Sequence, residues 1–240
     1  AETMARTVLA LLREGGVSRF GIRVHRAGEY PAKLRDARHP VELLYYQGSW
    51  SLVESPAVAV VGTREASEEG LAQTRELIRG LVEDGWTIAS GLAAGVDTAA
   101  HRAALAAGGT TFAVLGTPLS AVYPRGNQPL QRRLGEAQPA VSPVPVHRSS
   151  RQGWQENRGF FLERNVTMSA LTAATIVVEA RERSGTRTQA RAALEQGRKL
   201  FLLDGCFRDP AVRWPHAAVE AGALRVRDPG GVRGVSLINI

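Results

Sequence analysis

The sequence predicts an α/β protein with a Rossmann-like, doubly wound, mostly parallel sheet and a small N-terminal extension. Three observations lead to this prediction. Short apolar runs rich in valine and isoleucine recur from residue 57 onwards, several of them end at a glycine, and amphipathic stretches of helical length lie between them. Continuous apolar runs are typical of strands buried on both faces. Strands that alternate with helices through short connections form a parallel sheet with helices on both sides.

The expected strands are short and apolar. They cover residues 57–61, 86–89, 111–115, 175–179 and 199–203, and 223–226 is a possible last strand. The segment 139–146 holds three prolines, so we expect an edge strand there at best, because proline cannot donate to a sheet ladder. The polar stretch 147–158 that follows is expected to be an irregular connection.

The expected helices repeat apolar residues every three or four positions. They cover residues 67–84, 96–107, 162–171 and 186–196, with a short helix at 127–134. Gly85, Gly108 and Gly197 stand directly after three of these segments, where a glycine commonly ends a helix.

Residues 1–56 lack this alternation and are predicted to form the N-terminal extension, with a helix at 4–13 and a possible strand at 43–46. Residues 57–240 are predicted to form the Rossmann-like domain. Ligands of such sheets bind beyond the carboxyl ends of the strands.

Composition narrows the classes of function. The 240 residues include 30 Lys and Arg against 23 Asp and Glu, which gives a formal net charge of +7. Arginine predominates among the basic residues, and its guanidinium pairs with two phosphate oxygens at once. The single cysteine, Cys206, permits no intrachain disulfide, so we expect a reducing, cytoplasmic location. No apolar run approaches about 18 residues, so no membrane-spanning helix is expected.

Glycine-bearing turns follow the expected strands and suggest an anion site. Their sequences are VVGTR (60–64), ASGLAAG (89–95), VLGT (114–117) and RSGTRT (183–188). Glycine lets a backbone N–H approach an anion, and the first amides of a helix carry the positive end of its dipole. Gly91 is expected to turn the chain, and Gly95 to allow close approach to an anion or a neighbouring strand. Asp97 and His101 are four residues apart, so we expect them to share a helix face and to hydrogen-bond.

Several enzyme and cofactor motifs do not occur in the sequence. It contains no G-x-G-x-x-G, no G-x-x-x-x-G-K-[ST] and no G-x-S-x-G, and its five histidines lack metal-ligand spacing. These observations argue against a dinucleotide cofactor, a P-loop nucleotide, a serine nucleophile and a metal centre. We therefore expect no cofactor.

Longer motifs resemble the DprA/Smf family of DNA-processing proteins. They are VAVVGTREASEEG, IASGLAAGVDTAAHRAAL, FAVLGTPLSAVYPRGNQPL, ERN and IVVEARERSGTRTQARAALEQGRKLFLLDG, in this order, within about residues 30–205. The resemblance implies a cytoplasmic, non-enzymatic protein that binds single-stranded DNA, protects it during natural transformation, assists RecA loading and forms homodimers. It also implies that the DNA pocket uses Gly62, Thr63, Arg64, Ser90, Gly91, Ala93, Gly95, Arg164, Asn165, Ser184, Gly185 and Thr186.

Three positions depart from the family pattern. Pro118 stands where the family often has glycine, Val166 replaces an arginine, and Asp204 precedes Gly205 where proline is usual. The first change removes a backbone N–H and the second removes a positive charge.

The segment HRSSRQGWQENRGFFLERN (147–165) adds arginines and aromatic rings to the DNA-binding hypothesis. Its arginines are expected to follow phosphates, while Trp154, Phe160 or Phe161 stacks on bases. Arg125 is a secondary phosphate candidate. The alternative is a sensor or processor of a small nucleotide, related to the cytokinin-activating phosphoribohydrolases. In their motif the catalytic acid falls at Gln189, which cannot act as a carboxylate.

Overall fold

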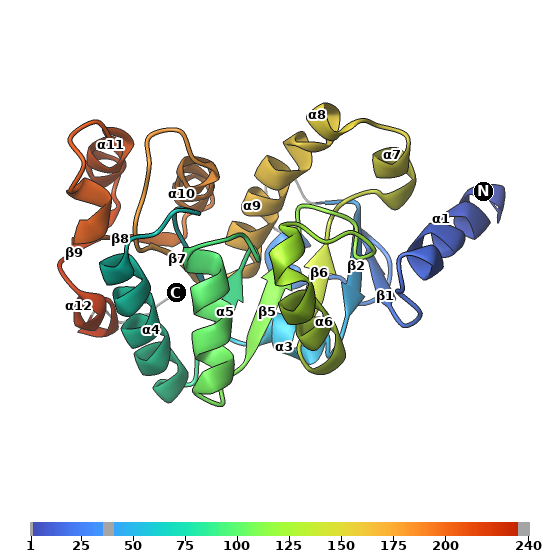
Figure 1. Cartoon of the computed structure of the whole chain (residues 1–240), viewed down its shortest axis with the longest axis horizontal. Helices are drawn as coiled ribbons and strands as arrows, with labels where there is room; N and C mark the ends of the chain where they lie inside the picture. Colours follow the sequence, from blue (N-terminus) through green and yellow to red (C-terminus); the bar gives the residue numbers. More distant parts are fainter. Residues whose placement is uncertain (1, 36–40, 235–240) are drawn as a thin grey trace.

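The computed structural model describes residues 2–35 and 41–234, and within them nine strands form one sheet (Figure 1). The strand order is β1-β2-β6-β5-β4-β3-β7-β8-β9. All neighbours from β6 to β9 run parallel, whereas β1 with β2 and β2 with β6 run antiparallel. The strands are β1 (Gly21–Val24), β2 (Leu43–Gln47), β3 (Ala57–Val61), β4 (Thr87–Ser90), β5 (Thr111–Val114), β6 (Ala140–Ser142), β7 (Ala174–Val177), β8 (Lys199–Leu203) and β9 (Leu224–Val226). The predicted Rossmann-like, mostly parallel sheet is confirmed.

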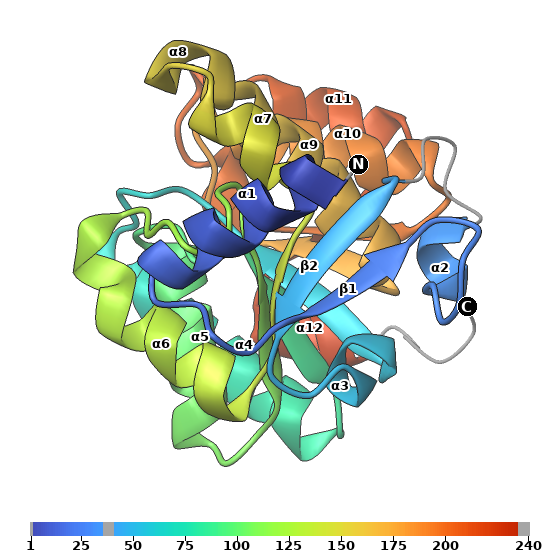
Figure 2. The ribbon, with the colours of Figure 1, turned by 90° about the vertical axis from the view of Figure 1, so that its right-hand side faces the viewer.

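Helices cover both faces of the sheet. In Figure 2 helices α9, α10 and α11 lie on one side, and α4, α5 and α6 lie on the other. The helices are α1 (Glu2–Glu14), α2 (Ala32–Arg35), α3 (Ser51–Glu54), α4 (Glu68–Glu83), α5 (Val96–Ala106), α6 (Gln128–Ala137), α7 (Val146–Ser150), α8 (Trp154–Asn157), α9 (Gly159–Leu171), α10 (Gly185–Glu195), α11 (Trp214–Glu220) and α12 (Pro229–Gly234). Two short 3₁₀ turns, η1 (Arg125–Asn127) and η2 (Asp204–Phe207), complete the list.

The central strand β3 shows why its sequence is apolar without alternation. Ala57, Ala59 and Val61 pack with residues of α9, α10 and α11. Val58 and Val60 face the opposite way and pack with α4, α5 and α12. Because both faces are covered, every residue of the strand is buried.

Two expectations for residues 139–158 are wrong. The strand β6 lies inside the sheet, between β2 and β5, and not at its edge. Its prolines flank the pairing residues, Pro139 before Ala140 and Pro143 after Ser142, so no proline occupies a ladder position. Residues 147–158 are not irregular throughout, because they contain most of α7 and all of α8.

The sheet continues into the N-terminal 56 residues. β2 pairs with β6 through Tyr45–Ser142, Tyr46–Val141 and Gln47–Ala140, and β1 adds a further strand. The domain boundary expected near residue 57 stays a prediction, and the sheet runs across it.

Candidate nucleic-acid interface

A cavity of about 660 Å³ opens beyond the carboxyl end of β3. Its walls come from the turn after β3, from α8 and α9, and from the turn that precedes α10. We call it the arginine cavity, because Arg64, Arg158, Arg164, Arg181 and Arg183 all line it. The sheet therefore presents a cavity where parallel sheets of this kind bind their ligands.

Most of the predicted site residues meet in this cavity. Those that line it are Gly62, Thr63, Arg64, Ala93, Arg164, Asn165, Ser184, Gly185 and Thr186. Four predicted residues do not line it. Ser90 is buried and donates to the Val60 carbonyl (2.7 Å), Gly91 and Gly95 lie in the turn beneath the cavity, and Arg125 is exposed outside it.

Three aromatic rings gather at the mouth of the arginine cavity. The centroids of Tyr123 and Trp154 are 5.0 Å apart, and Phe161 lies 5.3 Å from Tyr123 and 5.9 Å from Trp154. Trp154 is 51% exposed. The guanidinium of Arg64 lies 5.4 Å from the Tyr123 centroid and donates to the Tyr123 hydroxyl (3.2 Å). The cation–π contact thus places a charged donor beside the half-buried Tyr123 ring, next to the exposed Trp154.

Sequence reasoning did not assign Tyr123 to the site. Of Arg158, Arg181 and Arg183, it named only Arg158, as one of the arginines of segment 147–165 that were expected to follow phosphates. Arg158 and Arg183 are exposed and form no ion pair with any described residue. Arg181 instead pairs with Glu65 at 3.2 Å. Arg158 and Arg183, together with the exposed Arg64, thus carry charges that no described acidic residue pairs.

Phe160 and Phe161 have different surroundings, although they are adjacent. Phe160 is buried, and the guanidinium of Arg148 lies 5.4 Å from its centroid. Phe161 lines the cavity and packs against Gly116, where a Cβ would meet the Phe161 ring at 2.5 Å. Of the three aromatic candidates, Trp154 and Phe161 therefore belong to the site and Phe160 belongs to the core.

The floor of the arginine cavity corrects the expected anion seat. The Asp97 carboxylate accepts hydrogen bonds from the amides of Gly91 (3.0 Å) and Ala93 (3.4 Å), and the Thr63 amide donates to the Glu179 carbonyl (2.9 Å). These amides are already satisfied within the protein, so they are not available to a ligand. Burial raises the pKa of Asp97, while the nearby Arg164 and the two amides act in the opposite direction.

Arg164 belongs to this floor and is not a free phosphate contact. It is 5% exposed, and its Nη1 donates to the Val114 carbonyl at 2.7 Å. A Cβ at Gly91 would overlap the guanidinium, so this glycine makes room for an arginine and not for an anion. Burial lowers the pKa of Arg164, and the charge of Asp97 raises it.

The expected hydrogen bond between Asp97 and His101 is not formed. His101 is fully buried, and its Nδ1 lies 2.8 Å from the Thr111 hydroxyl, which in turn donates to the Ile88 carbonyl (2.7 Å). Burial lowers the pKa of His101 to about 3, so the ring is neutral at physiological pH. Gly95 has φ +72° and packs against the Thr63 carbonyl, which accepts from Val96 (3.3 Å), so its close approach is to the turn after β3 and not to a strand.

Backbone amides that remain available lie at the start of α10. The amides of Gly185 and Thr186 donate to no described residue, as expected for the first turn of a helix. Asn165 holds this turn by donating to the Gly185 carbonyl (2.8 Å), and the Thr186 hydroxyl donates to the Gly62 carbonyl (3.3 Å). The positive end of α10 therefore faces the arginine cavity.

Comparison with known proteins agrees with this arrangement. The profile of the family described as DNA recombination-mediator protein A matches residues 21–232. The chain belongs to this family. DNA processing protein DprA of Streptococcus pneumoniae is 38% identical over 197 residues, which are 82% of this chain and 67% of that protein. Protein Smf of a Synechocystis species is also 38% identical, over 80% of this chain and 47% of its own length.

Two solved structures of the recombination-mediator family share the fold. The structure of DprA from S. pneumoniae has a TM-score of 0.80 and 34% identity, and covers 94% of this chain and 77% of its own. DNA processing protein A from Helicobacter pylori, studied for its single-stranded DNA binding mode, has a TM-score of 0.75 and 25% identity over 91% and 96% of the two chains.

Two negative findings apply to residues 2–35 and 41–234. No group of three or more His, Cys, Asp or Glu side chains is arranged to hold a metal ion. No helix in these ranges is both long and apolar enough to cross a membrane.

Proposed function

We propose that the protein binds single-stranded DNA in the arginine cavity and does not cleave it. The observation that carries this proposal is that arginines without an ion pair to any described residue share one cavity with the exposed Trp154 and the half-buried rings of Tyr123 and Phe161. Arg158, Arg183 and the α10 amides are placed to bind phosphates, while Tyr123 and Trp154 offer ring faces to bases. The relative from H. pylori, which is named for binding single-stranded DNA, supports the same assignment.

The aromatic rings favour a single strand over a duplex. A base in a duplex already stacks on its neighbours, whereas a base in a single strand can place its face on a side chain. Trp154 has half of its surface free for such a contact. Arginines without aromatic rings would have bound either form.

Gln189 occupies the position of the catalytic acid in the cytokinin-activating phosphoribohydrolases, and its surroundings argue for binding without hydrolysis. Gln189 is 1% exposed, and its amide lies 3.3 Å from the Thr175 hydroxyl. It carries no carboxylate to activate water and is held by its neighbours. These contacts of Gln189 do not favour the alternative, a sensor of a small nucleotide, over DNA binding.

Family membership extends the proposal to the cellular role. We propose that the protein acts as a homodimer on incoming or recombining strands and assists RecA loading during natural transformation. Light scattering of the purified chain tests the dimer, and RecA loading on coated single strands tests the partner.

The decisive experiment measures fluorescence anisotropy of labelled single and double strands across a salt series. We expect tighter binding to single strands. The double variant Arg158→Ala/Arg183→Ala removes two phosphate contacts. The negative slope of log K against log salt should therefore become less steep by about 1.4. The matched control Arg79→Ala/Arg102→Ala removes two exposed arginines of α4 and α5 outside the cavity and should leave the slope unchanged. Equal loss in both variants would assign binding to net charge alone and refute the site.

A further inference from the structure

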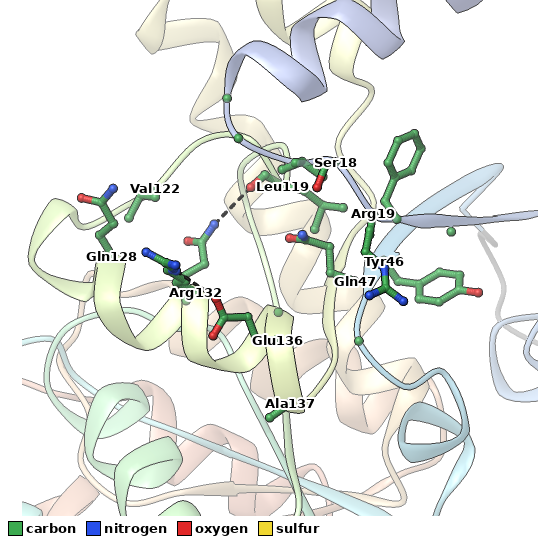
Figure 3. Close-up of a pocket in the computed structure, with 18 of the residues that line it drawn as sticks. Ser18, Arg19, Tyr46, Gln47, Leu119, Val122, Gln128, Arg132, Glu136 and Ala137 are labelled. Atoms are coloured by element: carbon green, nitrogen blue, oxygen red, sulfur yellow. Dashed lines mark hydrogen bonds and ion pairs between the residues drawn. The ribbon is translucent and has the colours of Figure 1, made fainter.

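A second and larger cavity, of about 1050 Å³, lies between the turn after α1, the end of β2 and one face of α6 (Figure 3). We call it the glutamine cavity, because Gln47, Gln128 and Gln131 line it. None of its lining residues lines the arginine cavity. We propose that the glutamine cavity holds a further nucleotide unit, a base with its phosphate; this inference rests on the proposed function.

Charge and donor chemistry support this ligand class. Figure 3 shows Arg19 on one wall, and Arg132 with Glu136 on the opposite wall. Arg132 pairs with Glu136 (2.9 Å), whereas Arg19 is exposed and forms no ion pair with any described residue. The lining therefore keeps one uncompensated guanidinium, whose geometry matches a phosphate.

The amide side chains fit the other half of a nucleotide. An amide offers a donor beside an acceptor, which is the pattern on the edge of a nucleobase. Neither the Gln47 nor the Gln128 amide hydrogen-bonds to a described residue, and Tyr46 adds a half-buried ring to the same lining. Gln131 has a different part, because its Nε2 donates to the carbonyls of Leu119 (3.3 Å) and Ala121 (3.2 Å) and so holds the loop that forms one wall.

The two cavities share that loop. Val122 lines the glutamine cavity and its neighbour Tyr123 lines the arginine cavity, so the same loop borders both cavities. Arg125 lies two residues after Tyr123, is exposed and precedes Gln128 by three residues. A strand that spans both cavities would follow this loop, on which Arg125 offers a further exposed charge.

Asn127 makes this crossing rigid. Its Nδ2 donates to the Leu92 carbonyl (2.9 Å) and to the Thr98 hydroxyl (2.7 Å), and the residue is buried. The loop is therefore fixed to the turn beneath the arginine cavity. Because this loop is fixed, the distance between the two cavities stays constant along a bound strand.

The test compares oligothymidylates of two lengths in anisotropy titrations at constant salt. A short strand of about 5 nucleotides fills the arginine cavity alone, and one of about 15 also reaches the glutamine cavity. We expect Arg19→Ala/Gln128→Ala to weaken binding of the long strand about tenfold and to leave the short strand unchanged. The control Arg133→Ala removes an exposed arginine of α6 that does not line the cavity and should change neither.

A second arm separates the source of the nucleotide. Thymidine monophosphate is titrated by calorimetry into the wild type and into the double variant. If the double variant loses binding of thymidine monophosphate but keeps its affinity for both oligonucleotides, the occupant of the glutamine cavity is a free nucleotide. Unchanged long-strand and mononucleotide binding in the double variant overturns the inference, even where the wild type binds both oligonucleotides. A wild type that binds neither oligonucleotide refutes the proposed function instead, and the mononucleotide arm still decides the glutamine cavity.

Discussion

The floor and the mouth of the arginine cavity differ in how their charges are used. On the floor, Asp97 and Arg164 are buried and bonded to backbone groups of neighbouring strands and turns. At the mouth, Arg158 and Arg183 are exposed and unpaired, and Trp154 is half exposed. A charge that is already satisfied stabilises the fold, whereas a charge left in water remains available to a ligand. Variants of the two regions should therefore fail in different assays.

The largest effect is expected for Arg164→Ala. This substitution leaves Asp97 buried without its compensating charge and removes a donor from Val114, so unfolding free energy should fall by about 3–5 kcal/mol. Urea unfolding at neutral pH measures the change. Arg158→Ala is the matched control and should stay within about 0.5 kcal/mol of the wild type. Equal stability of the two variants would contradict the distinction between floor and mouth.

Acid should destabilise the protein through His101, which lies behind the floor. Its pKa falls from an ordinary 6.5 to about 3 on folding, so the unfolded chain binds a proton that the folded chain excludes. The contribution of the neutral His101 ring to the free energy of unfolding is therefore complete above pH 6.5. It is lost as the pH falls toward 3, by up to about 1.4 kcal/mol per pH unit.

Urea unfolding between pH 7 and pH 4.5, in the wild type and in His101→Gln, isolates this effect. The raised pKa of Asp97 has the opposite effect on stability, because the folded chain keeps a proton on this carboxyl at a higher pH than the unfolded chain does. The effect of His101 is therefore taken from the difference between the two proteins and not from the pH dependence of the wild type alone. The same pH dependence in both proteins would show that His101 is not its source.

Gly91→Ala should cost about 1–3 kcal/mol, because its Cβ would displace the Arg164 guanidinium from a packed position. Gly126→Ala is the control, since a Cβ there meets nothing within 4 Å. Thermal unfolding of the two variants provides the measurement. Equal melting temperatures for Gly91→Ala and Gly126→Ala would show that the close contact between Gly91 and Arg164 does not contribute to stability.

The smallest change in stability, and a clear change in binding, is expected at the mouth. Trp154→Ala should weaken single-strand binding about tenfold, within the range of about 1–3 kcal/mol per stacked base. Its loss of ring contacts with Tyr123 and Phe161 should cost stability by no more than about 1.5 kcal/mol. Trp154→Phe should restore most of the affinity. Full affinity in Trp154→Ala would remove base stacking from the proposal.

Much of the fold could be predicted because burial on both faces leaves a local signature. The strand 57–61 was predicted to the residue, and the glycines after the helices fixed most helix ends. The position of β6 could not be predicted, because its prolines were counted without knowing that they flank the three pairing residues. Asp97 and His101 have the spacing of a hydrogen-bonded pair, yet the nearer amides and Thr111 compete successfully for them.

The site was predicted in outline and not in its chemistry. Glycine-bearing turns located the cavity, but sequence does not show which groups are already bonded, so Gly91 and Arg164 were assigned to a ligand although the protein itself engages them. Tyr123 joins the rim through contacts with residues more than 30 positions away. Only the three-dimensional arrangement brings these groups together.

The pairing of β2 with β6 has a practical consequence for anyone who trims this protein. A chain started at residue 57 would lose both antiparallel strands and leave the backbone groups of β6 open to solvent. Such an edge can recruit a strand from another molecule, so the shortened protein should be prone to aggregation on expression. The first 56 residues thus protect the sheet edge, whatever else they do.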